Sequence, residues 1–152
     1  MTKAGKVLAH HYPWMTCIHG AKHVIALFCS DVANLGPVRR MLRFARQVYM
    51  WFSSGAHHKA HALFTKHSNT VNGKKIGCMK YAATRMGESF YALLRILRLK
   101  DTFQFLLADP QFKALKGSDA PPGEMIQILK RDDLYIWLFK FLRPMYAVLR
   151  LL

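Results

Sequence analysis

The fold is decided by the stretch Ala82-Ala-Thr-Arg-Met-Gly-Glu-Ser-Phe-Tyr-Ala-Leu-Leu-Arg-Ile-Leu-Arg-Leu-Lys-Asp-Thr-Phe-Gln-Phe-Leu-Leu-Ala-Asp-Pro110. Apolar residues recur at helical spacing in its first half, which predicts a helix with one strongly apolar face. These residues are Phe90, Leu93, Leu94 and Leu97. Further along, the apolar residues move to the opposite side of an ideal helix: Ile96, Leu99, Phe103, Leu106 and Leu107. Either one helix is buried on two sides, or the helix breaks near Lys100 and Asp101.

The ends of this stretch carry helix start and stop signals. Asp101 is predicted to be the N-cap of a second helix, because its side chain can accept a hydrogen bond from the free backbone N–H groups there. Asp109-Pro110 is predicted to stop that helix, because proline disfavours helical geometry in the residue before it. The segment 84–87, Thr-Arg-Met-Gly, is expected to lead into the first helix.

Apolar periodicity predicts further helices on both sides of this stretch. The clearest covers 38–52, with Pro37 at the first helical position and a stripe made of Val38, Met41, Leu42, Ala45, Val48, Tyr49 and Phe52. Others are predicted at 22–33, 56–67, 124–130 and 134–152, with the first presenting Ala21, Ile25, Phe28 and Val32 and the last kinked by Pro144. Asp132 and Asp133 are expected to cap the last helix.

Loops and strands are few in this interpretation. The runs 68–75, with a turn at Asn72-Gly73, and 116–123 are predicted loops. The segment 76–83 is the one strand candidate. We therefore predict a mainly α fold of five to seven helices with at most one or two short strands.

The charge of the chain restricts its partners. The formal net charge is +15, from 23 Lys and Arg against 8 Asp and Glu in 152 residues. An excess of this size favours nucleic acid, with DNA as one possibility, or an anionic membrane surface. No apolar run approaches the ~20 residues that span a bilayer, so we expect no membrane span.

The cysteines indicate neither a disulfide framework nor a cysteine zinc site. Cys17, Cys29 and Cys78 are odd in number and lack paired spacing, which suggests an intracellular protein. The first 16 residues lack the apolar core of a secretory signal, although a poor transit peptide stays open. Cys17, His19 and His23 lie close in sequence, but no second ligand pair accompanies them, so we expect no metal and no cofactor.

Arginines form the strongest candidate site. Arg39, Arg40, Arg43 and Arg46 lie away from the apolar stripe of their helix. Three interpretations remain open: a solvated face, contact with phosphates, or docking to a membrane surface or a calmodulin-like partner. Lys74, Lys75 and Arg85 are further candidates for nucleic-acid contact, and Arg85 could equally pair with a buried carbonyl. His57, His58 and His61 are expected on a solvated, phosphate-facing surface.

The C-terminal part is unusually apolar. Trp137, Phe139, Phe141 and Leu142 have few evident partners within 152 residues, and the chain ends without a helix cap. We expect a fragment of a larger parent protein, or a homo-oligomer that is poorly soluble as a monomer.

Two segments resemble a known family. The run 23–38, His-Val-Ile-Ala-Leu-Phe-Cys-Ser-Asp-Val-Ala-Asn-Leu-Gly-Pro-Val, is similar to the His-x-Leu-x-Leu-x-x-x-Asp-Ile segment of hAT-superfamily DNA transposases. Thr84-Arg85 before a Leu-rich helix resembles the family's Thr-Arg-Trp or Thr-Arg-Phe segment. The chain departs from the family at Met86, which replaces a base-stacking aromatic residue, and at Gly20, which replaces a cysteine.

The resemblance implies a division of the chain and a function. Residues 1–16 would be a loosely ordered lead-in, 17–115 part of an RNase H-like core, and 116–152 the start of its helical insertion. The family cuts DNA with two metal ions held by three carboxylates, none of which falls inside this chain. We therefore expect a nuclear, catalytically inactive transposase-derived fragment that retains at most nonspecific nucleic-acid binding. The alternative is a basic helical interaction module, for instance a subunit of a ribonucleoprotein or organellar assembly.

Overall fold

The structure is a computed structural model in which residues 21–53, 55–80 and 88–149 are described. Their elements, in chain order, are α2 (Ala21–Asn34), α3 (Gly36–Ser53), α4 (His58–Asn72), α5 (Glu88–Arg98), α6 (Lys100–Ala108), α7 (Pro110–Lys113), the 3-10 turn η1 (Gly117–Asp119), α8 (Gly123–Leu129) and α9 (Asp132–Leu149). These ranges contain no strand, so the mainly α prediction is confirmed. Among the described helices, none combines the length and apolarity needed to cross a bilayer.

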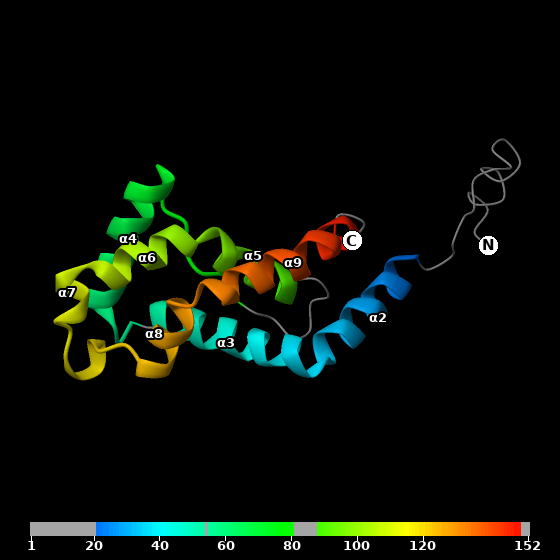
Figure 1. Cartoon of the computed structure of the whole chain (residues 1–152), viewed down its shortest axis with the longest axis horizontal. Helices are drawn as coiled ribbons and strands as arrows, with labels where there is room; N and C mark the ends of the chain where they lie inside the picture. The colour runs from blue at the N-terminus through cyan, green and yellow to red at the C-terminus, as the bar shows by residue number, and fades with distance from the viewer. Residues whose placement is uncertain (1–20, 54, 81–87, 150–152) are drawn as a thin grey trace, which may run out of the picture.

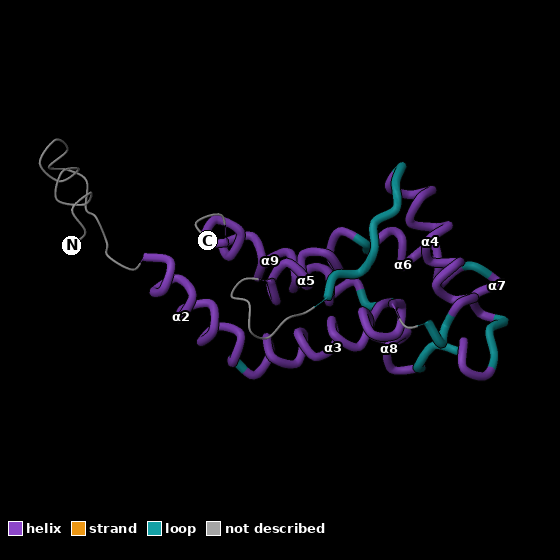
Figure 2. The backbone as a smooth tube through the Cα atoms, turned by 180° about the vertical axis from the view of Figure 1, so that it is seen from behind, coloured by secondary structure: helices purple, strands orange, loops and turns teal. Residues whose placement is uncertain are grey.

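Helix α5 lies at the centre of the arrangement. It packs against α3 on one side and against α9 on the other, and α6 continues from it to pack on α4 and α8. Helix α2 contacts α3 and extends away from the end of the molecule opposite α7 (Figures 1 and 2). The central position of α5 explains why its sequence is apolar on more than one side.

An aromatic cluster joins three of these helices. The rings of Phe52 in α3 and Phe64 in α4 have centroids 4.7 Å apart, and Phe103 in α6 lies 5.7 and 5.8 Å from them. All three side chains are almost fully buried. A similar pair, Phe90 and Phe141 at 6.0 Å, joins α5 to α9. Burial of large rings at these crossings is the main source of stability available to a helical domain.

The helix break expected near Lys100 lies at Leu99, which is fully buried. Its N–H donates to the carbonyls of Arg95 and Ile96, and its own carbonyl accepts from Phe103 N–H at 2.9 Å. The backbone hydrogen bonds therefore continue through the junction of α5 and α6. The prediction of Asp101 as N-cap is wrong, because the helix starts earlier and Leu99 occupies the cap position.

Asp109 stops α6 as predicted and also starts the next helix. Its Oδ1 accepts a hydrogen bond from Gln111 N–H at 2.7 Å, with Pro110 at the first position of α7. The expected cap pair before α9 is wrong, since Asp132 and Asp133 lie within the first turn of the helix. Segment 84–87 is outside the described residues.

The loop predicted at 68–75 is wrong for residues 68–72, which are helical. Helix α4 continues to Asn72 and ends at Gly73, whose φ of 66° is the left-handed conformation typical of a helix C-terminus. Ser68 can be buried in this helix because its hydroxyl donates a hydrogen bond to the Ile76 carbonyl at 2.8 Å and accepts one from the Ile76 N–H at 2.9 Å. The strand candidate forms no strand at 76–80, and its remaining residues, 81–83, lie outside the described ranges.

Two predicted apolar faces also need correction. In α2 the buried residues are Ala26 and Cys29, whereas Phe28 is 47% exposed. In α9, Leu142 is buried, and Trp137 and Phe141 pack partly against the core, so these three residues do find partners within the chain. Phe139 remains exposed, as expected for a residue without a partner.

Candidate nucleic-acid interface

Helix α3 divides into two faces along its length. The buried face is formed by Val38, Leu42, Phe44, Ala45, Val48, Trp51 and Phe52. Arg39, Arg40, Arg43 and Arg46 are all exposed, and at 100° per residue they fall within one side of the helix. We call these four residues the arginine face. The same periodicity that buries one side of α3 thus gathers the charges on the other.

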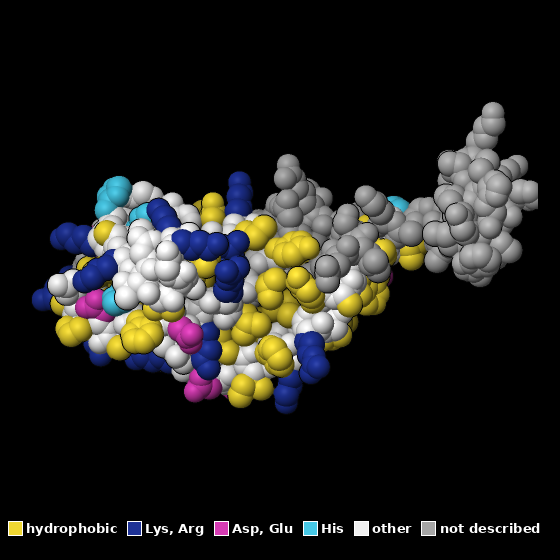
Figure 3. Space-filling model, turned by 90° about the horizontal axis from the view of Figure 1, so that it is seen from above, with side chains coloured by type: hydrophobic (Ala, Val, Ile, Leu, Met, Phe, Trp, Pro, Cys, Tyr) yellow, Lys and Arg dark blue, Asp and Glu magenta, His cyan; other side chains and the backbone are white. Residues whose placement is uncertain are grey.

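The arginine face is not neutralised by the described part of the chain. Its guanidinium groups make no ion pair with a described carboxylate. The sequence has no Asp or Glu at all between Val32 and Gly87, a segment that holds ten Lys and Arg residues. Basic side chains are spread over the visible surface in Figure 3, where acidic ones show at only a few places. A positive potential with no local counter-charge attracts polyanions.

Basic residues near the acidic ones have a different environment. The Nζ of Lys100 lies 3.0 Å from Oδ1 of Asp132, and Arg131 makes two hydrogen bonds to the carboxylate of Asp133. The Asp133 carboxylate raises the pKa of Arg131, and Arg131 in turn lowers the pKa of Asp133. These two cations are already paired, unlike the four of the arginine face.

The other predicted contact residues are not brought together with the arginine face. Lys74 and Lys75 are exposed, but they follow the end of α4, which lies at the opposite edge of the molecule from α3 (Figures 1 and 2). Arg85 lies outside the described residues. The described structure therefore separates the sequence-predicted set into two surfaces, of which α3 holds the larger number of cations.

The histidines at the start of α4 do not form the expected solvated surface. His58 is exposed, but the ring of His57 is stacked on the indole of Trp51, with centroids 5.0 Å apart and planes inclined by 22°. His57 Nδ1 is buried without a hydrogen-bond partner, and His61 is half-buried. The expectation is wrong for His57 because packing on Trp51 turns its ring inward.

Sequence reasoning missed a partly buried histidine–carboxylate pair. His67 Nε2 in α4 and Asp109 Oδ2 lie 2.7 Å apart, with side chains 18% and 11% exposed. The hydrogen bond from His67, together with the N–H of Gln111, lowers the pKa of Asp109. The two residues are 42 positions apart, and neither occurs in a recognisable motif, so no local pattern could have paired them. The pair ties α4 to the junction of α6 and α7.

The cysteines and histidines described offer no metal centre. Within 21–53, 55–80 and 88–149, no group of three His, Cys, Asp or Glu is placed to hold an ion, while Cys17 and His19 lie outside these ranges. Burial raises the pKa of Cys29 and raises that of Cys78 to about 12. Both thiols are therefore held in the unreactive protonated form at neutral pH.

No protein-family model matches the sequence, and no curated protein or solved structure is significantly similar to it, so function is argued from the residues of this chain.

Proposed function

We propose that this protein binds nucleic acid through the arginine face of α3, without sequence preference and without chemistry on the bound strand. The observation that carries the proposal is the set of four exposed guanidinium groups on one side of one helix, none of which forms an ion pair with a described carboxylate. Arginine suits this role because its planar guanidinium donates in a fork that matches phosphate oxygens.

The dimensions of the arginine face fit a phosphate backbone. Arg39 and Arg46 are seven residues apart, which is roughly 10 Å along a helix that rises 1.5 Å per residue. All four guanidinium groups therefore lie within a short length of helix and can meet one stretch of the phosphate backbone together. Contacts to phosphates alone carry no sequence information, hence the proposal of nonspecific binding.

Several described carboxylates are engaged in structural roles. Asp109 caps α7 and binds His67, Asp132 pairs with Lys100, and Asp133 pairs with Arg131. Phosphodiester cleavage by two metal ions needs several carboxylates directed at one point. We therefore propose a binding protein rather than a nuclease or transposase.

Descent from hAT transposases stays a separate prediction. It would account for the basic charge and would put the catalytic acids outside this chain. Nuclear localisation belongs to the same prediction. Binding through α3 does not depend on it, since the arginine face is argued from the helix itself.

The test compares two triple variants that remove the same charge. Arg39→Gln, Arg43→Gln and Arg46→Gln together form the arginine triple. Lys59→Gln, Lys66→Gln and Lys113→Gln form the lysine triple, taken from exposed positions on α4 and α7 that are not candidate contacts. Fluorescence anisotropy with a labelled random-sequence duplex at fixed salt measures both affinities.

We expect the arginine triple to weaken binding by at least about tenfold, because each lost phosphate contact also loses its released counterions. The lysine triple should change affinity by no more than about threefold, as expected for a change in diffuse charge. Equal losses in both triples would assign binding to the overall charge and not to α3.

A second candidate is a basic interaction module within a ribonucleoprotein assembly. The observation in its favour is the exposed apolar side of α2, where Val24, Leu27 and Phe28 are each about half exposed or more, and Leu35 just after the helix is exposed as well. Such a module would use α2 for a protein partner. Leu27→Glu with Phe28→Glu would then abolish co-sedimentation with ribonucleoprotein particles, whereas the arginine triple would leave it intact.

A further inference from the structure

A cleft of about 320 Å³ opens between the first turns of α3 and the corner where α8 meets α9. Its walls are apolar and come from all three helices: Met41, Ile128, Leu134 and Trp137. Small-molecule sites in proteins have volumes of roughly 300–1,000 Å³ and combine apolar walls with a few polar groups. The cleft is at the small end of this range.

The polar groups of the cleft leave one positive charge without a counter-charge. Arg131 and Asp133 on the rim neutralise each other through two hydrogen bonds, one of them 3.0 Å between Nε and Oδ1. Arg40 also lines the cleft and makes no ion pair with a described carboxylate. Two guanidinium groups and one carboxylate therefore leave a net charge of one, located at Arg40.

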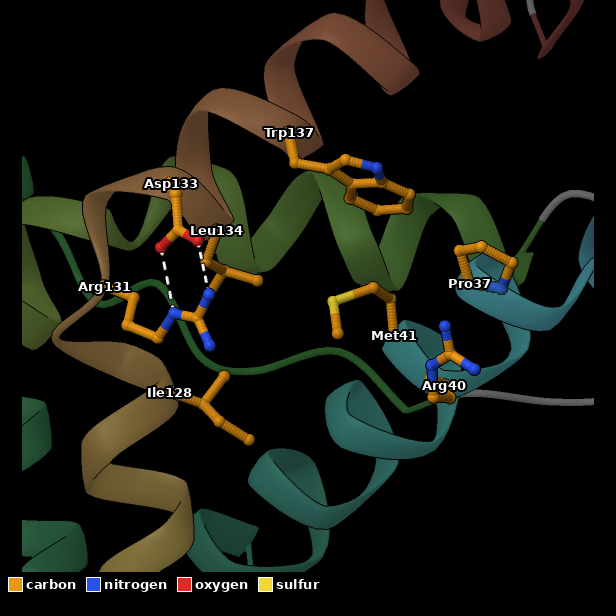
Figure 4. Close-up of a pocket in the computed structure, with 8 residues that line it drawn as sticks. All are labelled: Pro37, Arg40, Met41, Ile128, Arg131, Asp133, Leu134 and Trp137. Carbon is orange, nitrogen blue, oxygen red and sulfur yellow. Dashed lines mark hydrogen bonds and ion pairs between the residues drawn. The ribbon is translucent and has the colours of Figure 1, made fainter.

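The aromatic wall of the cleft is held in place from behind. Trp137 stacks on Phe141 with ring centroids 5.0 Å apart and planes inclined by 9°, which fixes the orientation of the indole. Figure 4 shows Trp137 above Met41, with Pro37 and Arg40 towards one end of the gap and Ile128 with the Arg131–Asp133 pair towards the other. An indole facing a thioether favours a flat aromatic body, because sulfur and ring contacts are both attractive to it.

We infer that this cleft is a binding site for a small aromatic monoanion, such as an aryl carboxylate, whose ring lies between Trp137 and Met41 and whose charged group meets Arg40. The inference is independent of nucleic-acid binding, although Arg40 belongs to both surfaces. A single negative charge is specified because Arg40 is the one unpaired cation among the described residues that line the cleft.

The test uses the full chain and three probes. They are 2-naphthoate, the uncharged 2-naphthylmethanol of similar shape, and octanoate, which carries the charge without the ring. The indole N–H signal of Trp137 in a ¹⁵N NMR spectrum reports occupancy, and it is assigned among the signals of three tryptophans by Trp137→Phe. We expect 2-naphthoate to shift this signal at concentrations roughly tenfold lower than either other probe.

Two matched variants separate the cleft from the general positive charge of the protein. Arg40→Gln removes the cation of the cleft, whereas Arg43→Gln removes an equally exposed cation from the same helix but outside the cleft. We expect Arg40→Gln to weaken the affinity for 2-naphthoate roughly tenfold and to leave the affinity for 2-naphthylmethanol unchanged. Arg43→Gln should change neither affinity.

Three results would overturn the inference. Equal affinities of the wild type and Arg40→Gln for 2-naphthoate would show that Arg40 does not recognise the negative charge. Equal affinities for octanoate and 2-naphthoate would show that the cleft does not select an aromatic ring. A Trp137 signal that stays in place while other residues respond to 2-naphthoate would locate the aromatic site elsewhere. DNA affinity of the same variants is a separate measurement, so failure of this inference does not affect the nucleic-acid proposal.

Discussion

Ser68 is a fully buried polar residue at the contact of α4 with the segment that follows it. Its hydroxyl donates to the Ile76 carbonyl and accepts from the Ile76 N–H, so both backbone groups of that residue are satisfied by one side chain. Asn72 extends the network by donating to the Ser68 carbonyl and to the Thr102 hydroxyl, both at 3.0 Å. The network holds the chain after α4 against α6.

Replacing Ser68 with alanine should therefore destabilise the protein. The Ile76 N–H would be left buried without an acceptor, which costs about 1–3 kcal/mol. Thr70→Ala is the control, because the Thr70 hydroxyl is exposed and bonds only within its own helix, to the Lys66 carbonyl. Its effect should lie within about 0.5 kcal/mol. Equal free energies of unfolding for the two variants in a urea titration would contradict this role of Ser68.

Asp109 should make stability depend on acid pH. Its pKa is lowered in the folded state by the hydrogen bonds from His67 and Gln111. A carboxylate of this kind stabilises the protein above its unfolded pKa of about 3.9, and the contribution is lost as the pH falls through the lower folded value. Thermal melts from about pH 5 downwards should therefore show a smaller decline in Tm for Asp109→Asn than for the wild type.

The matched control for the acid melts is Asp133→Asn. Asp133 also has a lowered pKa, but both Asp133 and its partner Arg131 are exposed. Screening by solvent makes exposed ion pairs weak, so Asp133→Asn should flatten the pH dependence of Tm less than Asp109→Asn does. Parallel curves for the wild type and Asp109→Asn would show that the His67–Asp109 pair contributes nothing to acid stability.

At the scale of the element, α6 shows how one helix distinguishes core from surface. Phe103 is fully buried in the aromatic cluster with Phe52 and Phe64, whereas Phe105, two residues later, is 60% exposed. Phe103→Ala should cost about 3–5 kcal/mol, because it leaves a cavity where three helices meet. Phe105→Ala should fall within about 0.5 kcal/mol. A comparable loss of stability in the two variants would contradict the packing of α6.

Periodicity predicted the helices whose faces are decided by one strong apolar stripe. In α3 most of the predicted stripe from Val38 to Phe52 is buried, but Met41 and Tyr49 are only half-buried, and Phe44 and Trp51 are buried beside it. Periodicity was less informative for α2, where Phe28 is exposed and the smaller Ala26 is buried. The reason is that α2 contacts α3 near one end of the molecule, and close packing there selects small residues.

The end of α4 could not be predicted from local signals. Ser68, Asn69, Thr70 and Asn72 are typical loop residues, and only a tertiary partner makes them helical. Ser68 obtains that partner in Ile76 and Asn72 in Thr102, 30 residues away. For the candidate site, the arginine face followed directly from the spacing of the arginines. The His67–Asp109 pair and the cleft beside Trp137 depend on contacts between distant segments, which no single-sequence pattern contains.

At the scale of the whole molecule, charge is unevenly distributed along the chain. Seven of the eight acidic residues follow Gly87, while the segment between Val32 and Gly87 has only cations among its Asp, Glu, Lys and Arg residues. This places α3 and α4 in the acid-free segment and puts the paired cations Lys100 and Arg131 in the later one. Association with a polyanion should therefore be directed to the first of these segments, and it should weaken with salt.

The salt dependence of DNA binding tests this account most directly. The dissociation constant of a random-sequence duplex is measured across a series of salt concentrations for the wild type and for the arginine triple, after a thermal melt has shown that both are folded. Each phosphate contact contributes about 0.9 to the slope of log affinity against log salt on B-DNA, because condensed counterions are released. The account predicts that the magnitude of the slope falls by about 2 to 3 in the arginine triple. An unchanged slope in the folded variant would contradict the central claim and show that the arginine face of α3 does not contact the nucleic acid.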